Sequence, residues 1–188
     1  MTLILATVIG ECVVIAADHR IHCGPEGGPY ESGEGDKLFT NDLCVVASYG
    51  TSPPDYDVPA LIRRELNQYQ NPYLLTQSLH QEISSLANFG AVGLLVGGFG
   101  TEGHELWDAK PPNGIQRLNT NHQVVHTRGA CEQELIRNFS NTQELNVDLI
   151  SIFAYASQLT DTVGAPYEIA TLKMGLPTVI QRFCAHLP

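Results

Sequence analysis

The chain has 188 residues, of which 43% are hydrophobic and 16% are charged, a balance typical of a folded globular protein rather than a disordered or fibrous one. A chain of this length buries about 70% of its unfolded surface, so one domain over residues 1–188 is expected to fold without a disulfide or metal. Ten Lys and Arg residues against 20 Asp and Glu residues give a formal net charge of −10, which argues against nucleic acid and anionic membranes as partners.

The apolar start of the chain predicts a buried strand rather than a targeting signal. MTLILATVI has no basic segment before it and no small-residue cleavage site after it, and it is too short to span a bilayer. The five cysteines are odd in number and scattered along the chain, which favours free thiols in a reducing compartment. We therefore expect a cytoplasmic protein with no membrane segment.

The first fifty residues predict two pairs of strands. Residues 3–9 and 12–18 are β-rich runs at hairpin distance, joined by Gly10-Glu11. Residues 23–35 are so rich in glycine and proline that we expect a mobile loop without a regular element. The segments DKLFT and LCVVASYG then flank Asn41-Asp42 as a second strand pair.

The rest of the chain predicts helices and strands in alternating groups. Apolar residues at three- and four-residue steps predict helices over 58–71 and 72–88, and weaker patterns predict helices over 131–139 and 147–159. Strands are expected over 91–99, 104–109, 169–172 and 178–181, with Pro111-Pro112-Asn113-Gly114 as a turn. Strands grouped between pairs of helices indicate an α+β fold with antiparallel sheets, and a four-layer α-β-β-α sandwich satisfies this order.

Three features near the start of the chain occur together: Thr2 behind Met1, the hairpin end VVIAADHR, and DKLF about twenty residues later. Together they resemble the β-type subunits of proteasomes and the related bacterial self-compartmentalising peptidases, which are N-terminal nucleophile hydrolases. The resemblance covers most of the chain in element order and is sharpest over residues 2–50. It implies a threonine-type endopeptidase that works in homo-oligomeric rings on peptides or unfolded proteins. It implies no cofactor and no metal, and it identifies no unfoldase partner.

The resemblance assigns the catalytic residues. In that family a threonine hydroxyl attacks the substrate carbonyl, while an aspartate and a lysine set its protonation, and Thr2, Asp18 and Lys37 match these positions. A free α-amine, with an ordinary pKa near ~8, is a proton acceptor on the same residue as the hydroxyl. This amine requires removal of Met1, which the small side chain of Thr2 favours. Lys37 is expected to lower the effective pKa of the hydroxyl, and Asp18 to hold Lys37 charged and oriented.

The resemblance also implies the remaining site residues. Asp161 matches an aspartate that follows the fourth helix, the backbone N–H of Ser48 takes the position of the oxyanion donor, and Val46 and His22 border the side-chain pocket. The family usually has a Gly-Ser-Gly-like turn before its third helix. Here the stretch is TRGACEQ, which contains no serine.

Other functions remain open from the sequence alone. Without the serine, the chain could be a catalytically silent structural subunit, and the same sandwich could act on a small amide. His19, His22 and Cys23 form an HxxHC cluster, but no second ligand pair has metal spacing, so solvated turn residues are the preferred interpretation. Cys131 at a helix start could act as a nucleophile only with a positioned histidine, and His126 on a preceding strand is a weak candidate.

Overall fold

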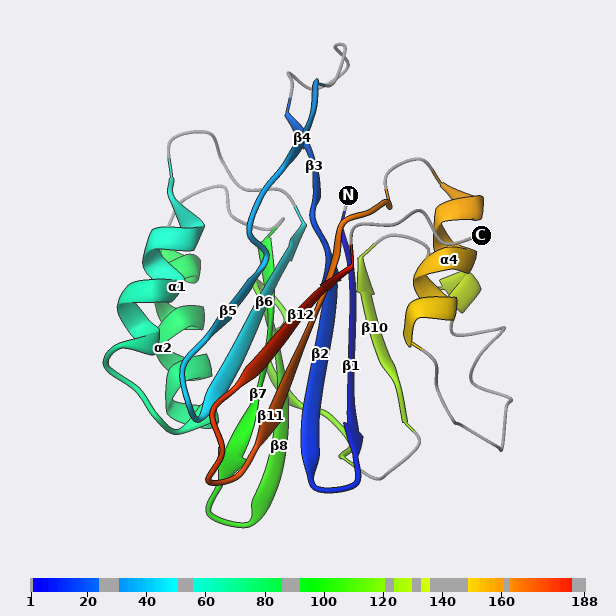
Figure 1. The fold of residues 1–188 in the computed structure, drawn as a ribbon. Helices are drawn as coiled ribbons and strands as arrows, with labels where there is room; N and C mark the ends of the chain where they lie inside the picture. The colour runs from blue at the N-terminus through cyan, green and yellow to red at the C-terminus, as the bar shows by residue number, and fades with distance from the viewer. Residues whose placement is uncertain are drawn as a thin grey trace.

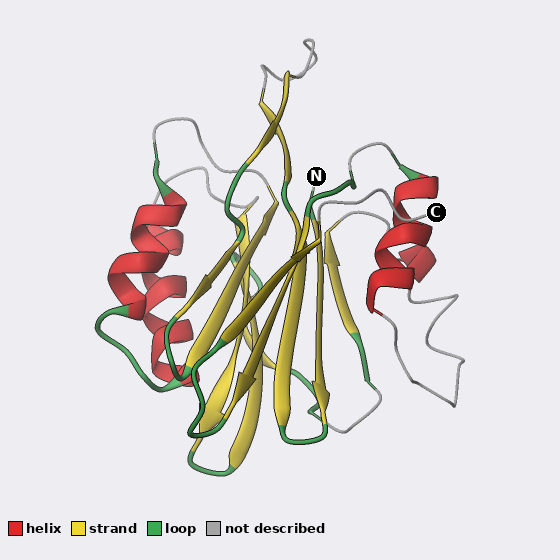
Figure 2. Cartoon of the chain, in the orientation of Figure 1, coloured by secondary structure: helices red, strands yellow, loops and turns green. Residues whose placement is uncertain are grey.

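The structure is a computed structural model in which the strands form two facing sheets, with helices on both outer sides (Figures 1 and 2). It describes residues 2–23, 31–50, 56–85, 92–120, 124–129, 133–135, 149–160 and 163–183, with the backbone alone at 20–23, 31–34 and 150. All structural statements below concern these residues.

Two five-stranded antiparallel sheets form the centre of the described fold. The first sheet has the order β10-β1-β2-β11-β12, with the bounds β1 (Leu3–Ile9), β2 (Cys12–Asp18), β10 (His126–Gly129), β11 (Tyr167–Lys173) and β12 (Val179–Phe183). The second sheet has the order β5-β6-β7-β8-β9, with the bounds β5 (Leu38–Thr40), β6 (Cys44–Gly50), β7 (Val92–Gly100), β8 (Gly103–Lys110) and β9 (Gly114–Arg117).

Helices cover the outer face of each sheet. α1 (Val58–Leu66) and α2 (Pro72–Ser85) lie against the second sheet, and α4 (Leu149–Leu159) lies against the first (Figure 1). α1 begins where the Asp57 side chain accepts a hydrogen bond of 2.9 Å from the backbone N–H of Ala60, an N-cap contact. The predicted four-layer α-β-β-α order is therefore the observed one.

The alternation of side chains along β1 explains why four layers form. Leu3 and Leu5 are buried in a cluster with α4, whereas Ile4 and Ala6 are buried between the two sheets. Successive side chains of a strand point to opposite faces of the sheet. Because both faces of β1 are apolar, the strand is stable only when it is covered on both sides, by a second sheet and by a helix.

The predicted strands and helices are confirmed in type and order, except that α1 ends at Leu66 and the expected helical residues 67–71 are not helical. Of the helix expected over 131–139, residues 133–135 are described and helical, and the others lie outside the described residues. The two prolines of the predicted turn at 111–114 are joined by a cis peptide bond. No helix in the described part of the chain is long and apolar enough to cross a membrane.

The expectation of a structureless loop over 23–35 is wrong in part. β3 (Arg20–Cys23) pairs antiparallel with β4 (Glu31–Glu34), and the two strands form a ribbon that extends beyond the sandwich (Figure 1). Glycine lowers the intrinsic tendency to form a strand, but cross-strand backbone hydrogen bonds do not need side chains. β3 continues the direction of β2 after His19, so its partner strand forms despite the composition.

Candidate active site

The β1–β2 hairpin places Thr2 and Asp18 at the same end of the first sheet. Ile4 pairs with Ala17, so Leu3 lies opposite Asp18, and its backbone N–H donates a hydrogen bond of 2.9 Å to Asp18 Oδ1. Thr2 is 6% exposed, and Asp18 is fully buried. A carboxylate thus lies one residue from the predicted nucleophile, in a place that water does not reach.

Lys37 reaches the same carboxylate from the second sheet. It directly precedes β5, is 3% exposed, and its Nζ lies 3.1 Å from Asp18 Oδ1. Asp18 Oδ1 therefore joins the ammonium of Lys37 to the backbone N–H of the residue after Thr2. The structure brings the predicted aspartate and lysine into direct contact beside Thr2, across the interface between the two sheets.

Burial changes the proton affinity of both members of this pair. It raises the pKa of the Asp18 carboxyl, against the opposing effects of the Lys37 charge and the Leu3 N–H. It lowers the pKa of the Lys37 ammonium, against the opposing effect of the Asp18 charge. Each charge opposes the effect of burial on the pKa of the other group, so the two titrations are coupled.

The backbone of His19 fixes the end of β2 that carries Asp18. Its N–H donates to the carbonyl of Pro166 at 2.9 Å, and its own carbonyl accepts from Gly35 N–H at 3.0 Å. Gly35 lies two residues before Lys37, so the backbone of His19 is hydrogen-bonded close to both Asp18 and Lys37. The buried His19 side chain lies 2.7 Å from Glu168 Oε2. The described residues contain no cluster of His, Cys, Asp and Glu that could hold a metal ion.

Gly129 packs directly against Thr2 and was not predicted from the sequence. It ends β10, lies opposite Leu3, and has a φ of 97°, which side-chain-bearing residues rarely adopt. A Cβ atom at this position would lie 1.7 Å from the carbonyl oxygen of Thr2. The stretch TRGACEQ contains no serine, but its Gly129 is required by the contact with Thr2. The sequence indicated this contact only by a single glycine at the end of a strand.

The oxyanion assignment of Ser48 does not agree with the structure. The backbone N–H of Ser48 already donates to the carbonyl of Lys37 at 3.2 Å, as part of the pairing of β6 with β5. Backbone N–H groups on one side of a strand recur every second residue, so the next one on that side belongs to Gly50. Gly50 ends β6 with a φ of 89°.

Val46 is fully buried in the cluster formed by α1, α2 and the second sheet, and its assignment to the floor of a side-chain pocket stays a prediction. Ser48, two residues along the same face of β6, is partly exposed. His22 lies in β3 opposite Ser32, and its side chain is outside the described part of the structure.

The other candidate residues divide into those outside the described residues and those with a structural role. Asp161, Thr162 and Cys131 lie outside the described residues. His126 Nε2 lies 2.7 Å from the carbonyl oxygen of Asn119, and burial lowers the pKa of its ring. Burial raises the pKa of the Cys44 thiol to about 12, so that thiol is protonated at neutral pH and is no nucleophile.

The two facing antiparallel sheets with helices outside them form an α+β sandwich of the proteasome-homologue fold. Among solved structures, the chain is similar to a Gly-1 mutant of Anbu from Hyphomicrobium sp. strain MC1. The TM-score is 0.74 at 15% sequence identity, over 98% of this chain and 88% of that one. No family model matches the sequence, and no curated protein matches it. At this identity the likeness establishes the fold and leaves the activity to be argued from the site.

Proposed function

We propose that this protein is a threonine-type endopeptidase in which Thr2 becomes the nucleophile once Met1 is removed. The observation that carries the proposal is the buried Asp18–Lys37 pair, which lies beside Thr2 at the end of the hairpin. A buried ion pair is expensive to desolvate and is weak evidence for stability, so its presence beside a hydroxyl favours a role in chemistry.

Acylation begins when the Thr2 Oγ attacks the carbonyl carbon of a peptide bond. The hydroxyl proton passes to the α-amine of Thr2, and the carbonyl oxygen becomes an oxyanion. When the C–N bond breaks, the leaving amine takes that proton and an ester joins Thr2 to the acyl fragment. A water molecule, deprotonated by the same amine, then hydrolyses the ester and restores the hydroxyl.

Lys37 and Asp18 support this step without forming a bond to substrate. The Lys37 ammonium stabilises the developing negative charge on the Thr2 oxygen, and Asp18 keeps that ammonium protonated despite its burial. The backbone N–H at Gly50 is assigned to the oxyanion, in place of Ser48. Ser48 takes the place of Val46 at the border of the side-chain pocket, because it is the partly exposed residue on that face of β6.

The test compares Thr2→Ala and Thr2→Ser with the unmodified chain. We expect Thr2→Ala to abolish peptide hydrolysis and Thr2→Ser to retain part of it, with both chains folding alike. Intact mass before and after treatment with a peptide epoxyketone, which reacts with both the amine and the hydroxyl of an N-terminal threonine, reports processing and reactivity together. An unprocessed and unreactive chain would identify a structural subunit, and turnover of small amides without peptides would identify an amidohydrolase.

We also propose that the chain assembles into homo-oligomeric rings in the cytoplasm and takes peptides or unfolded proteins as substrates. The support is the proteasome-homologue fold, the acidic surface charge and the scattered cysteines. Native mass spectrometry tests the assembly directly. A chain that stays monomeric at micromolar concentration would contradict the ring, while leaving the proposed chemistry of Thr2 to the hydrolysis assay.

A further inference from the structure

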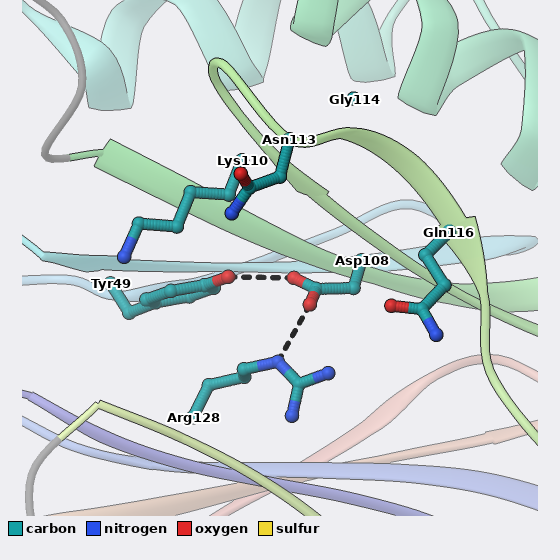
Figure 3. A pocket seen from close by; sticks show the side chains of 7 residues that line it. All are labelled: Tyr49, Asp108, Lys110, Asn113, Gly114, Gln116 and Arg128. Carbon is teal, nitrogen blue, oxygen red and sulfur yellow. Dashed lines mark hydrogen bonds and ion pairs between the residues drawn. The ribbon is translucent and has the colours of Figure 1, made fainter.

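A second polar network joins the two sheets near the candidate active site (Figure 3). The hydroxyl of Tyr49 donates to Asp108 Oδ1 at 2.6 Å, and Arg128 Nε donates to Asp108 Oδ2 at 2.6 Å. Tyr49 belongs to β6 and Asp108 to β8 of the second sheet, whereas Arg128 belongs to β10 of the first. Asp108 thus receives a donor from each sheet, and we call these three residues the inter-sheet bridge.

Two of the bridge residues directly precede the ends of strands, and one of these strand ends contacts Thr2. Tyr49 directly precedes Gly50, the last residue of β6, and Arg128 directly precedes Gly129, the last residue of β10. Gly129 contacts the Thr2 carbonyl, and Gly50 carries the donor assigned to the oxyanion. Both strand ends are glycines with positive φ, and a glycine has no side chain that could fix its position.

Polar contacts, rather than apolar packing, surround this part of the sheet interface. A cavity of about 290 Å³ lies at the bridge, bordered by the bridge residues and by Lys110, Asn113, Gly114 and Gln116. The side chains of Asp108 and Arg128 are 14% and 17% exposed, so their ion pair is largely shielded from water. Arg128 Nη1 also donates to the carbonyl of Thr127 at 2.7 Å, which fixes the guanidinium to its own strand. Charge-assisted hydrogen bonds of this length are stronger than neutral ones.

We propose that Tyr49, Asp108 and Arg128 are positioning residues that hold the Gly50 end of β6 and the Gly129 end of β10 at a fixed separation, so that the donor proposed at Gly50 keeps its position relative to Thr2. This inference rests on the proposed function of Thr2. A displacement of about 1 Å in such a site lowers the rate on the order of 100-fold, so a bridge that prevents this displacement is expected to affect kcat.

The structural test uses Tyr49→Phe, with Thr7→Val as the matched control. Each variant removes one hydroxyl that makes a hydrogen bond between segments distant in sequence, since Thr7 Oγ1 donates to the carbonyl of Val124 at 2.8 Å. Thr7 lies on β1 away from the site and is 1% exposed. By amide hydrogen exchange, we expect Tyr49→Phe to speed exchange at residues 50 and 129 at least tenfold, and Thr7→Val to leave both unchanged. Unchanged exchange at these two positions in Tyr49→Phe would overturn the proposal.

The kinetic test separates positioning from stability. We expect Tyr49→Phe to lower kcat about 10- to 100-fold with KM within about twofold, and Asp108→Asn to lower kcat further, because it also leaves the Arg128 charge unpaired. Thr7→Val should lose stability without losing kcat. Equal kcat in Tyr49→Phe and the unmodified chain would overturn the proposal. If the unmodified chain hydrolyses nothing, the proposed function fails, and the exchange measurement still decides whether the bridge holds the two strand ends.

Discussion

The two ends of the β1–β2 hairpin each carry an ion pair, but the two pairs differ in how far their side chains are exposed to water. At one end Asp18 and Lys37 are buried and 3.1 Å apart, and at the other Glu11 and Lys173 are the same distance apart with side chains 81% and 46% exposed. The exposed pair lies in high dielectric, where such contacts contribute little to stability. The buried pair loses hydration that its attraction only partly recovers. The buried pair at the Thr2 end is therefore weak evidence for stability, and this supports the proposal that its charges serve chemistry.

The largest effect is expected from Lys37→Met. This change removes the cation beside Thr2, so hydrolysis should fall about 10³-fold, and it leaves the Asp18 charge buried without a partner, which costs about 3–5 kcal/mol of unfolding free energy. Urea unfolding and peptide turnover measure the two losses. The double variant Asp18→Asn with Lys37→Met is the control, because it restores most of the stability and none of the activity. If it restored activity as well, the pair would have no part in the chemistry.

The pH dependence of Lys37→Met sharpens the comparison. The carboxyl of Asp18 loses the influence that lowers its pKa, so the already raised pKa rises further above the ordinary 3.8. Its protonated form is the one tolerated by burial, so stability is retained at low pH and is lost as pH rises through the raised pKa. We expect the unfolding free energy of the variant, relative to the unmodified chain, to decrease between pH 4 and pH 8. A pH-independent difference would mean that water reaches the carboxylate.

Asp18→Asn should move the alkaline limb of the activity profile to lower pH. The Asp18 charge opposes the effect of burial on Lys37, so its removal lowers the Lys37 pKa further below the ordinary 10.5. Lys37 then loses its proton, and the cation beside Thr2, at a lower pH. The profile of kcat/KM for the two chains over pH 6 to 10 measures this displacement. A limb that stays in place would assign the ionisation to another group.

Gly129→Ala should lower activity by a smaller factor than Lys37→Met, while disturbing the same end of the hairpin. The new methyl group would collide with the Thr2 carbonyl, and the φ of 97° is strained for alanine. We expect a loss of about 1–3 kcal/mol of stability and about 10-fold or more in kcat. Gly10→Ala is the matched control, since Gly10 also has positive φ but has nothing within 4 Å of its Cβ position. Equal kcat losses in both would contradict a specific contact with Thr2.

The sequence was most informative where one strand decides the outcome. The order of strand and helix patterns is enough to predict the hairpin and the layered fold. The pairing of Asp18 with Lys37 was predicted from the resemblance to proteasome β-type subunits. The assignments of Ser48 and Val46 depend on contacts that the local pattern does not give: the Ser48 N–H is paired with the Lys37 carbonyl, and Val46 lies under α1 and α2.

The inter-sheet bridge and Gly129 could not be predicted for a different reason. Leu3 and Gly129 are direct partners on the neighbouring strands β1 and β10, although 126 residues separate them in the chain. Tyr49, Asp108 and Arg128 come from three strands whose relative positions depend on the pairing of both sheets. No local pattern in the sequence carries such information. The residues of the site that depend on long-range pairing were therefore found only in the structure.

The smallest effect is expected from Glu11→Gln at the far end of the hairpin. Its carboxylate lies 3.1 Å from Lys173 Nζ, but both groups are in contact with water, so the pair is screened by salt and its loss should shift the melting temperature by at most ~2 °C. Hydrolysis should not change, because the pair lies at the opposite end of β1 from Thr2. Melting at low and at high salt measures the effect. A drop as large as that of Lys37→Met would show that burial does not separate the two ends, and the argument that the Asp18–Lys37 pair is functional would lose its basis.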